Sequence, residues 1–207
     1  MLSISSILSS ADTLGTGFLP VKEEEWWFAV GNKKYWKEND KDDLLISFTS
    51  IGGHVEDGEG IIDATLREVK EETGNNATIS SADQTFIIEA EIIEENVFNF
   101  QIKSKELINI EDTPNPWIIY KVKTISGLLG VVVYQGEFDG QPYPQAEVPA
   151  LICLPPGLLQ QCPILLKSSL SNGAKLLEQD DKIPRNALIY PFGSATIIKE
   201  LINSSSS

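Results

Sequence analysis

The sequence predicts an α/β fold in which one well-marked helix follows directly on a strand. Residues 61–73 carry apolar side chains at helical spacing, and residues 44–49 just before them are apolar enough for a strand. Residues 117–125 and 128–138 are rich in β-branched and aromatic residues, which favour strands. Helix and strands together place the chain in the α/β class.

The N-terminal half is expected to begin its regular structure with a strand at 26–30. Gly31 and Asn32 then indicate a turn, and the charged stretch 33–43 indicates a polar loop. The strand at 44–49 leads from this loop into a glycine-rich segment and the helix. The expected order is therefore strand, loop, strand, glycine loop and helix.

Downstream of the helix, residues 85–94 and 97–102 are expected to form short strands. The segments 117–125 and 128–138 flank Ser126 and Gly127, a pair of small residues that suits a hairpin turn. This hairpin is assigned to the central sheet.

The C-terminal part is expected to be helical at 158–167, 173–179 and 196–202, although Pro163 would break or kink the first of these segments. We interpret these segments as packing elements or as the surface of a homodimer. Residues 1–203 are expected to form a single domain, and the serine run 204–207 a disordered tail.

Composition limits the classes of partner. The chain has 207 residues and a net charge of −14, with only two arginines and with dispersed lysines. Long nucleic acid requires a field of basic side chains, so a small phosphorylated metabolite is the better expectation. The N-terminal segment has neither a basic leader nor an apolar run long enough to span a membrane, and Cys153 and Cys162 lack a metal-ligand pattern. We therefore expect a cytoplasmic protein with buried thiols and no membrane partner.

The helix at 61–73 has two faces of different chemistry. Its apolar stripe consists of Ile62, Leu66, Val69 and Thr73, and its other side carries Glu68, Glu71 and Glu72. Acids at this spacing repel one another by a few tenths of a kcal/mol per pair unless a cation lies among them. Magnesium, which takes oxygen ligands and keeps several waters, suits such a cluster together with a substrate phosphate. A solvated acidic face is the alternative for a charge run considered alone.

Glycines mark both ends of this helix. Gly60 is a suitable N-cap, and Gly74 can end the helix with a positive φ. Gly52, Gly53 and Gly58 precede the helix, and their backbone can approach a ligand closely.

These positions resemble the Nudix box, in which G, five residues, E and seven residues precede R-E-hydrophobic-x-E-E-x-G-hydrophobic. Asn75 occupies the final hydrophobic place, and Ile51 replaces the proline that commonly precedes the two glycines. Neither departure touches a charged position. The residues in register are Gly53, Glu59, Arg67, Glu68, Val69, Glu71, Glu72 and Gly74.

The resemblance implies a Nudix-type α/β/α sandwich with a central mixed sheet. It also implies metal-dependent hydrolysis of a diphosphate bond in a nucleoside diphosphate-linked metabolite, with Mg²⁺ as cofactor and Mn²⁺ as a substitute. By this resemblance Glu71 and Glu72 are metal ligands, and Glu68 is a ligand or the base that orients the attacking water. The Gly53 carbonyl is a further candidate ligand.

The same resemblance assigns a structural role to the rest of the box. Glu59 and Arg67 are expected to pair and to hold the loop against the helix, since arginine suits two-point capture of a carboxylate. Gly74 belongs to the same structural support.

Residues 136–154 resemble the late loop of the family, in which an acidic residue precedes a strand that returns to the sheet. Glu147 follows a proline-rich stretch and is a candidate general base or additional ligand, preferred to Glu137 at a strand end. An ordinary loop carboxylate is the alternative for Glu147.

The rival functions come from two other classes. One is a catalytically silent Nudix-fold module that binds a nucleotide, and the other is an unrelated acidic protein with coincidental spacing. His54, the only histidine, is expected to contact substrate or solvent, and Trp26 and Trp27 are expected mainly to pack.

Overall fold

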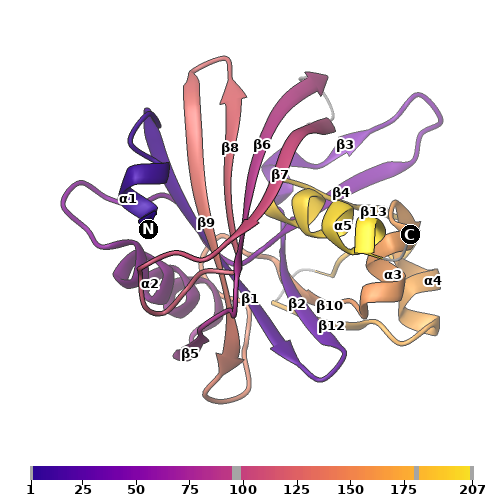
Figure 1. The fold of residues 1–207 in the computed structure, drawn as a ribbon. Coiled ribbons are helices and arrows are strands. Elements are labelled where there is room, and N and C mark those ends of the chain that lie inside the picture. The colour runs from indigo at the N-terminus through magenta and orange to yellow at the C-terminus, as the bar shows by residue number, and fades with distance from the viewer. Residues whose placement is uncertain (1, 95–98, 180–181, 206–207) are drawn as a thin grey trace.

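The computed structural model describes residues 2–94, 99–179 and 182–205. Helices lie on both sides of a layer of strands (Figure 1), with α1 and α2 on one side and α3, α4 and α5 on the other. The α/β prediction is confirmed. The helices are α1 (Ile4–Ile7), the short 3-10 turn η1 (Lys33–Tyr35), α2 (Ile61–Thr73), α3 (Pro156–Gln161), α4 (Leu166–Ser171) and α5 (Ser194–Ser205).

The strands of the described residues join in one mixed sheet. Its main path runs β11-β13-β4-β2-β1-β9-β8-β6-β7, with β10 beside β2 and β12, β3 beside β4, and β5 beside β9. The strands are β1 (Thr13–Lys22), β2 (Glu25–Val30), β3 (Lys37–Glu38), β4 (Leu44–Thr49), β5 (Ala77–Ser80), β6 (Thr85–Glu94), β7 (Asn99–Ile108), β8 (Ile118–Thr124), β9 (Gly127–Phe138), β10 (Ala150–Cys153), β11 (Ile164–Leu165), β12 (Lys175–Glu178) and β13 (Leu188–Pro191).

The long strand β1 joins the two halves of the sheet. It runs parallel to β9 over most of its length and pairs antiparallel with β2 at its C-terminal end. Phe18, in the middle of β1, also exchanges backbone hydrogen bonds with Ile51, so that the segment after β4 lies along the same strand. This contact fixes the start of the box beside the centre of the sheet.

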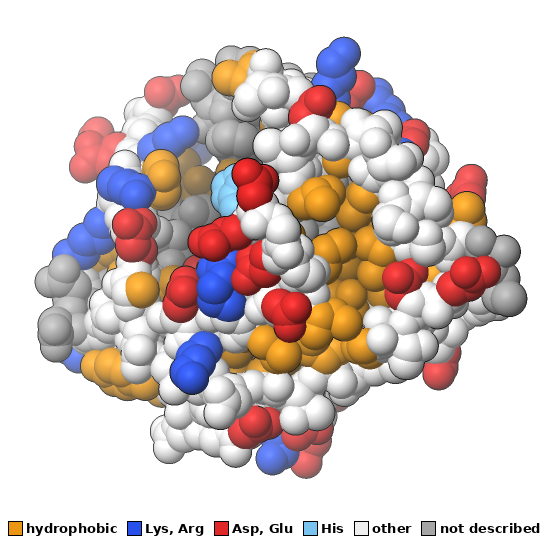
Figure 2. Space-filling model, turned by 90° about the vertical axis from the view of Figure 1, so that its left-hand side faces the viewer, with side chains coloured by type: hydrophobic (Ala, Val, Ile, Leu, Met, Phe, Trp, Pro, Cys, Tyr) orange, Lys and Arg blue, Asp and Glu red, His pale blue; other side chains and the backbone are white. Residues whose placement is uncertain are grey.

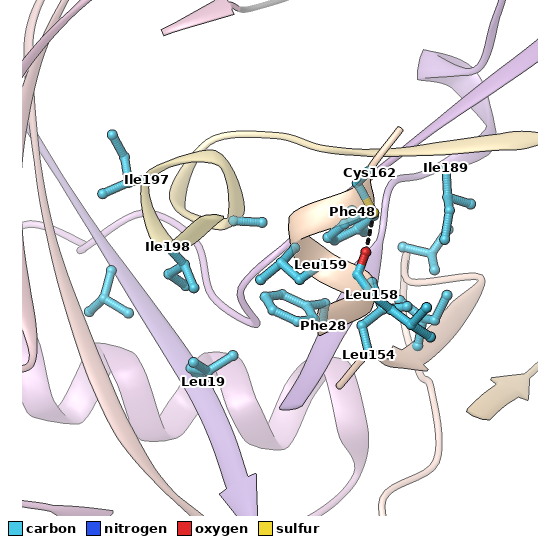
Figure 3. Close-up of a cluster of buried hydrophobic side chains, with 14 of the residues drawn as sticks. Leu19, Phe28, Phe48, Leu154, Leu158, Leu159, Cys162, Ile189, Ile197 and Ile198 are labelled. Atoms are coloured by element: carbon cyan, nitrogen blue, oxygen red, sulfur yellow. Dashed lines mark hydrogen bonds between the residues drawn. The ribbon is translucent and has the colours of Figure 1, made fainter. Parts of the chain in front are cut away.

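Two apolar cores lie on the two sides of the sheet. The first is covered by α3 and α5, whose side chains Leu158, Leu159, Ile197 and Ile198 belong to the same cluster as Phe28, with Leu159 next to Phe28 in Figure 3. In the second, Val69 of α2 belongs to the same cluster as Phe18, Ile51, Tyr134 and Leu151. The C-terminal helices are therefore packing elements of the first core, which is one of the two roles expected for them.

Several strands and helices were predicted with the observed bounds. The predicted ranges 44–49, 61–73 and 85–94 coincide with β4, α2 and β6, and the hairpin of β8 and β9 turns at Ser126 and Gly127. The strand expected at 97–102 corresponds to β7, which begins at Asn99 and is longer, while residues 97–98 lie outside the described residues. The C-terminal helix α5 reaches Ser205, two residues into the expected serine tail.

The prediction of a helix at 173–179 is wrong. Residues 175–178 form β12, which pairs antiparallel with β10. The helix expected at 158–167 ends at Gln161, just before Pro163, and α4 begins only at Leu166. Residues 175–178 form a strand because they pair with a distant strand. The helix α3 ends early because the proline ring cannot be accommodated within a helix.

Other elements were not expected from the sequence. The polar loop at 33–43 contains η1 and the two-residue strand β3, and β1, β5 and β13 were not predicted. Cys153 and Cys162 are free and buried, as expected. Among the described residues, no helix is both long and apolar enough to cross a membrane.

Candidate active site

Glycine fixes both ends of α2, the helix that carries the box acids. Gly60 is the N-cap, with an extended backbone and no side-chain cap, and Gly74 takes the left-handed conformation with φ of 65°. A Cβ at position 74 would also lie 2.1 Å from Nε2 of Gln145. Gly74 is therefore required by its backbone conformation and by the close approach of a neighbouring loop.

The apolar face of α2 is slightly rotated from the predicted stripe. Ala64, Thr65, Val69 and Thr73 are buried, whereas Ile62 and Leu66 are only partly buried. The Thr65 hydroxyl bonds with the Thr16 hydroxyl of β1, which draws this side of the helix to the sheet. The helix was correctly placed, but two small residues make its closest contact because a helix packed tightly on a strand leaves little room.

Arg67 lies among the acidic side chains and binds three of them. Its Nε and Nη2 donate to the two carboxylate oxygens of Glu59 at 2.9 and 3.1 Å, and Nη2 also donates to the His54 carbonyl at 3.0 Å. Nη1 donates to Glu68 at 2.9 Å and to Glu71 at 3.3 Å. On the face shown in Figure 2, acidic side chains gather around a basic one close to the histidine, beside an apolar surface.

The pairing has the expected electrostatic effects. The hydrogen bond with Glu59 raises the pKa of Arg67, and the same bond lowers the pKa of Glu59. In this structure, Arg67 itself supplies a cation among the acids. The repulsion between the acids therefore does not by itself require a metal, which corrects a step of the sequence argument.

Glu72 is in a different environment from the other two acids. It is half-buried, and its Oε2 accepts the Gly52 N–H at 3.1 Å. Burial raises its pKa to about 8, the charges of Glu68 and Glu71 act in the same direction, and the Gly52 hydrogen bond acts against them. None of the interactions recorded for the described residues gives Glu72 a cationic partner.

The glycines of the box loop, residues 51–60, allow the loop to touch the helix. A Cβ on Gly53 would lie 2.4 Å from Glu68 Oε1, and one on Gly52 would lie 2.2 Å from the Thr16 carbonyl. The Gly53 carbonyl accepts the Thr16 N–H at 2.9 Å, so one of its two lone pairs is already used. Gly53 is thus the position that lets Glu68 lie against the loop.

The three acids of α2 offer the kind of ligand atoms that a divalent cation needs. Glu68, Glu71 and Glu72 offer oxygen atoms only, and Glu72 is a partly buried carboxylate without a cationic partner among the described residues. This chemistry fits a hard cation such as Mg²⁺. Within residues 2–94, 99–179 and 182–205, however, no group of three or more His, Cys, Asp or Glu side chains is arranged as a metal cluster.

Glu147 lies on a loop that is fastened to the end of α2. The Gln145 N–H donates to the Glu72 carbonyl at 2.8 Å, and the Tyr143 N–H donates to the Thr73 carbonyl at 3.0 Å. The Glu147 side chain is 75% exposed and forms an ion pair with Lys34 at 2.9 Å. The structure therefore brings the backbone of this loop to the helix, while the carboxylate contacts the turn after β2.

A cavity of about 240 Å³, here called the box cavity, opens beside the box loop. Three of its lining residues, Gly52, Gly53 and His54, were expected from the sequence to lie near a ligand. The others were missed, because β7, β8 and the start of α5 come together only in the folded chain. Further lining residues include Ser50, Phe100, Tyr120, Val131, Gly193 and Ser194.

Trp26 and Trp27 of β2 pack against the two apolar cores. Trp26 packs against the first core and makes an edge-to-face contact with Trp117, with ring centroids 5.8 Å apart. Trp27 packs against the second core. Both tryptophans therefore pack in the protein interior, as expected from the sequence.

A comparison with protein-family models supports the resemblance of residues 53–74 to the Nudix box. Residues 19–106 match the family model of the NUDIX domain. No curated protein sequence matches the chain.

Solved structures of low sequence identity are also similar. A possible asymmetric diadenosine tetraphosphate hydrolase from Jonesia denitrificans is 12% identical, with 93% of this chain and 94% of that chain covered and a TM-score of 0.49. A hydrolase of the NUDIX family from Clostridium perfringens is 20% identical, with coverage of 72% and 85% and a TM-score of 0.44.

The matched range includes β2, β4, the box loop and α2, and it ends within β7. It therefore contains every box residue in register, with Arg67 paired to Glu59 and Glu68 against Gly53. Residues 19–106 therefore match a NUDIX domain, and the match includes the whole box.

Proposed function

We propose that the protein hydrolyses a diphosphate bond in a small nucleoside diphosphate-linked metabolite with the help of a divalent cation. The observation that carries this proposal is Glu72, a partly buried carboxylate without a cationic partner among the described residues, beside Glu68 and a glycine loop. A cytoplasmic location and a homodimer, both expected from the sequence, remain part of the proposal.

Glu68, Glu71 and Glu72 would hold the cation, with the second lone pair of the Gly53 carbonyl as a further oxygen. Mg²⁺, or Mn²⁺ in its place, would lower the pKa of a bound water and polarise the phosphoryl oxygens. Arg67 holds Glu68 and Glu71 in place and ties the loop to the helix through Glu59. These contacts keep the ligand geometry fixed before substrate arrives.

The proton of the attacking water needs a carboxylate acceptor. Glu68 is one candidate, since it is only 15% exposed and lies against the box loop. Glu147 is the other, because its loop is fastened to α2 through Gln145, although its side chain now contacts Lys34. A general base contributes about 100-fold to 10,000-fold in rate.

A catalytically silent nucleotide-binding module is the second candidate function. Arg67 neutralises part of the charge on Glu59, Glu68 and Glu71. A protein that never binds a metal could therefore keep these acids without strong repulsion. This contact is the specific observation in favour of the module.

The decisive experiment is a panel of nucleotide sugars, dinucleotides and nucleoside triphosphates, assayed with Mg²⁺, with Mn²⁺ and with neither. Wild type should release product only with a cation, and Glu72→Gln should lower turnover at least about 100-fold. Glu106→Gln, an exposed acid on β7, is the matched control and should behave as wild type. Equal turnover of wild type and Glu72→Gln would reject the site, and metal-independent binding without turnover would favour the module.

Two further variants separate the candidate bases. If Glu147 takes the proton, Glu147→Gln should lower kcat while the affinity for Mn²⁺ stays unchanged. If Glu68 takes it, Glu68→Gln should lower kcat and Glu147→Gln should have no effect. Lys34→Ala serves as the control for loss of the Lys34–Glu147 ion pair alone.

A further inference from the structure

The box cavity shares residues with the proposed catalytic site. Gly52 and Gly53 line the cavity, and the same two glycines contact Glu72 and Glu68. A molecule whose diphosphate lies at these acids can therefore extend directly into the cavity. The cavity is the continuation of the site along the box loop.

The lining of the box cavity disfavours a charged ligand group. Apolar walls come from β6 to β9 and include Phe100 and Val131, and the described lining residues include no Lys, Arg, Asp or Glu. Apart from the exposed His54, the described lining residues offer no basic side chain, so a phosphate or carboxylate would lose its hydration here with little compensation, at a high cost in free energy. An uncharged group therefore fits this lining best.

Tyr120 adds a directional hydrogen-bonding group to this wall. It is only 4% exposed, it lines the cavity, and no hydrogen bond of its hydroxyl is recorded among the residues that the structure describes. No polar side-chain atom that is fully enclosed lacks a partner in that part of the chain, so the hydroxyl must reach open space. Buried tyrosine hydroxyls usually have a partner, which indicates that this one is supplied by a ligand.

The neighbouring hydroxyls do not compete for this role. Ser194 bonds to Ser50 Oγ at 2.5 Å and to Thr49 at 3.0 Å, and it accepts the Ser50 N–H at 3.1 Å. These contacts fix the floor of the cavity at the start of α5. Tyr120 is thus the buried side chain on this wall that is placed to bind a polar edge of a ligand, whereas His54 on the box loop is exposed.

The volume limits what can enter. Sites for drug-sized ligands span roughly 300–1,000 Å³, and the box cavity has about 240 Å³. It therefore admits one ring system and not a second nucleotide. Phe100 on the wall offers an aromatic face for such a ring.

Resting on the proposed function, we propose that the box cavity binds the uncharged ring of the substrate, a nucleobase, and that Tyr120 is a specificity-determining residue. Its hydroxyl hydrogen-bonds the polar edge of the ring, while the diphosphate lies at Glu68, Glu71 and Glu72. Substrates whose group on this side is an acidic sugar or a second phosphate are excluded.

The test uses nucleosides without phosphate, so that it does not depend on the acids or on a metal. Adenosine, guanosine, cytidine and uridine are titrated into metal-free protein and followed by ligand-observed NMR. At least one should bind wild type, and Tyr120→Phe should weaken that affinity about tenfold, the effect of one lost hydrogen bond in a buried site. No binding by wild type, or equal binding by Tyr120→Phe, would overturn the assignment.

Tyr134→Phe is the matched control. Tyr134 is 1% exposed, lies on β9 and lines a different cavity, so that the same change should leave nucleoside affinity unchanged. Equal weakening in both variants would count against a specific role for Tyr120. Thermal unfolding of both variants checks that they remain folded.

The outcome separates the two proposals. Nucleoside binding that depends on Tyr120, without turnover of any diphosphate in the panel, would leave the cavity assignment standing and reject the hydrolase. Turnover without nucleoside binding would reject the cavity assignment alone. Glu72→Gln should retain nucleoside binding. Among the described residues, the Glu72 side chain contacts the cavity wall through one hydrogen bond, from the Gly52 N–H.

Discussion

Arg67 and Glu59 form a two-point ion pair that fastens the box loop to α2, with Nε–Oε1 and Nη2–Oε2 distances of 2.9 and 3.1 Å. Nη1 of the same guanidinium holds Glu68 and Glu71, so one side chain organises the loop and the acids together.

We expect Arg67→Lys to lower the Tm although it keeps the charge, because an ammonium group cannot bind both oxygens of Glu59 in parallel. Glu59→Gln should also lower the Tm. The double variant should lose less than the sum of the two single losses, as residues in one contact are coupled. Strictly additive losses, measured by calorimetry, would contradict the pairing.

Gly53→Ala tests the close approach of Glu68. The new Cβ would meet the carboxylate 2.4 Å away, and the flexible side chain would move aside. We expect a change in stability below about 1 kcal/mol but a loss of turnover on the order of 100-fold, since a small misplacement of a reacting group is costly.

The control for this variant is Gly157→Ala. Gly157 lies in α3, with nothing within 4 Å of the added Cβ, so the change should be neutral or stabilise the protein by about 0.5–1 kcal/mol. If both variants keep full turnover, Gly53 has no special role in placing Glu68.

Gly74→Ala should destabilise the protein for two separable reasons. Its φ of 65° is unfavourable for alanine, and the Cβ would collide with the Gln145 side chain. We expect a loss of about 1–3 kcal/mol in urea unfolding. Adding Gln145→Ala should recover the steric part only, so full recovery or none would contradict this division.

Glu178 predicts a pH dependence of stability. Burial acts to raise its pKa, but hydrogen bonds from Arg185 and the Ile183 N–H outweigh burial, and the pKa is lowered. A lowered carboxyl pKa stabilises the fold above the unfolded-state pKa, near 4.3, and this stabilisation is lost as the pH falls through the folded-state value.

Glu178→Gln should therefore cost about 1 kcal/mol at pH 7 and progressively less below pH 4. Urea unfolding at a series of pH values from 7 to 3 measures this difference. Glu106→Gln, at an exposed position on β7, should show no such trend. A constant difference between wild type and Glu178→Gln over the whole series would rule out the linkage.

The elements predicted correctly are those with a strong local pattern. The helix from Ile61 to Thr73 has an apolar stripe and a glycine at each end, and the hairpin around Ser126 and Gly127 has β-branched residues on both sides. By contrast, residues 175–178 became a strand because β10 lies beside them. A short apolar segment fits either structure, so its partner decides.

The candidate site divides in the same way. The residue types and spacing of the box determined which acids share one helix face and where the loop needs glycine, because those properties depend on positions close in the chain. Only the tertiary structure decided that Arg67 lies among the acids, that Glu72 lacks a cationic partner among the described residues, and that Tyr120 lines the same cavity as the box loop. Burial and contacts between distant segments exist only once the sheet has formed, and they set the electrostatics and the shape of the site.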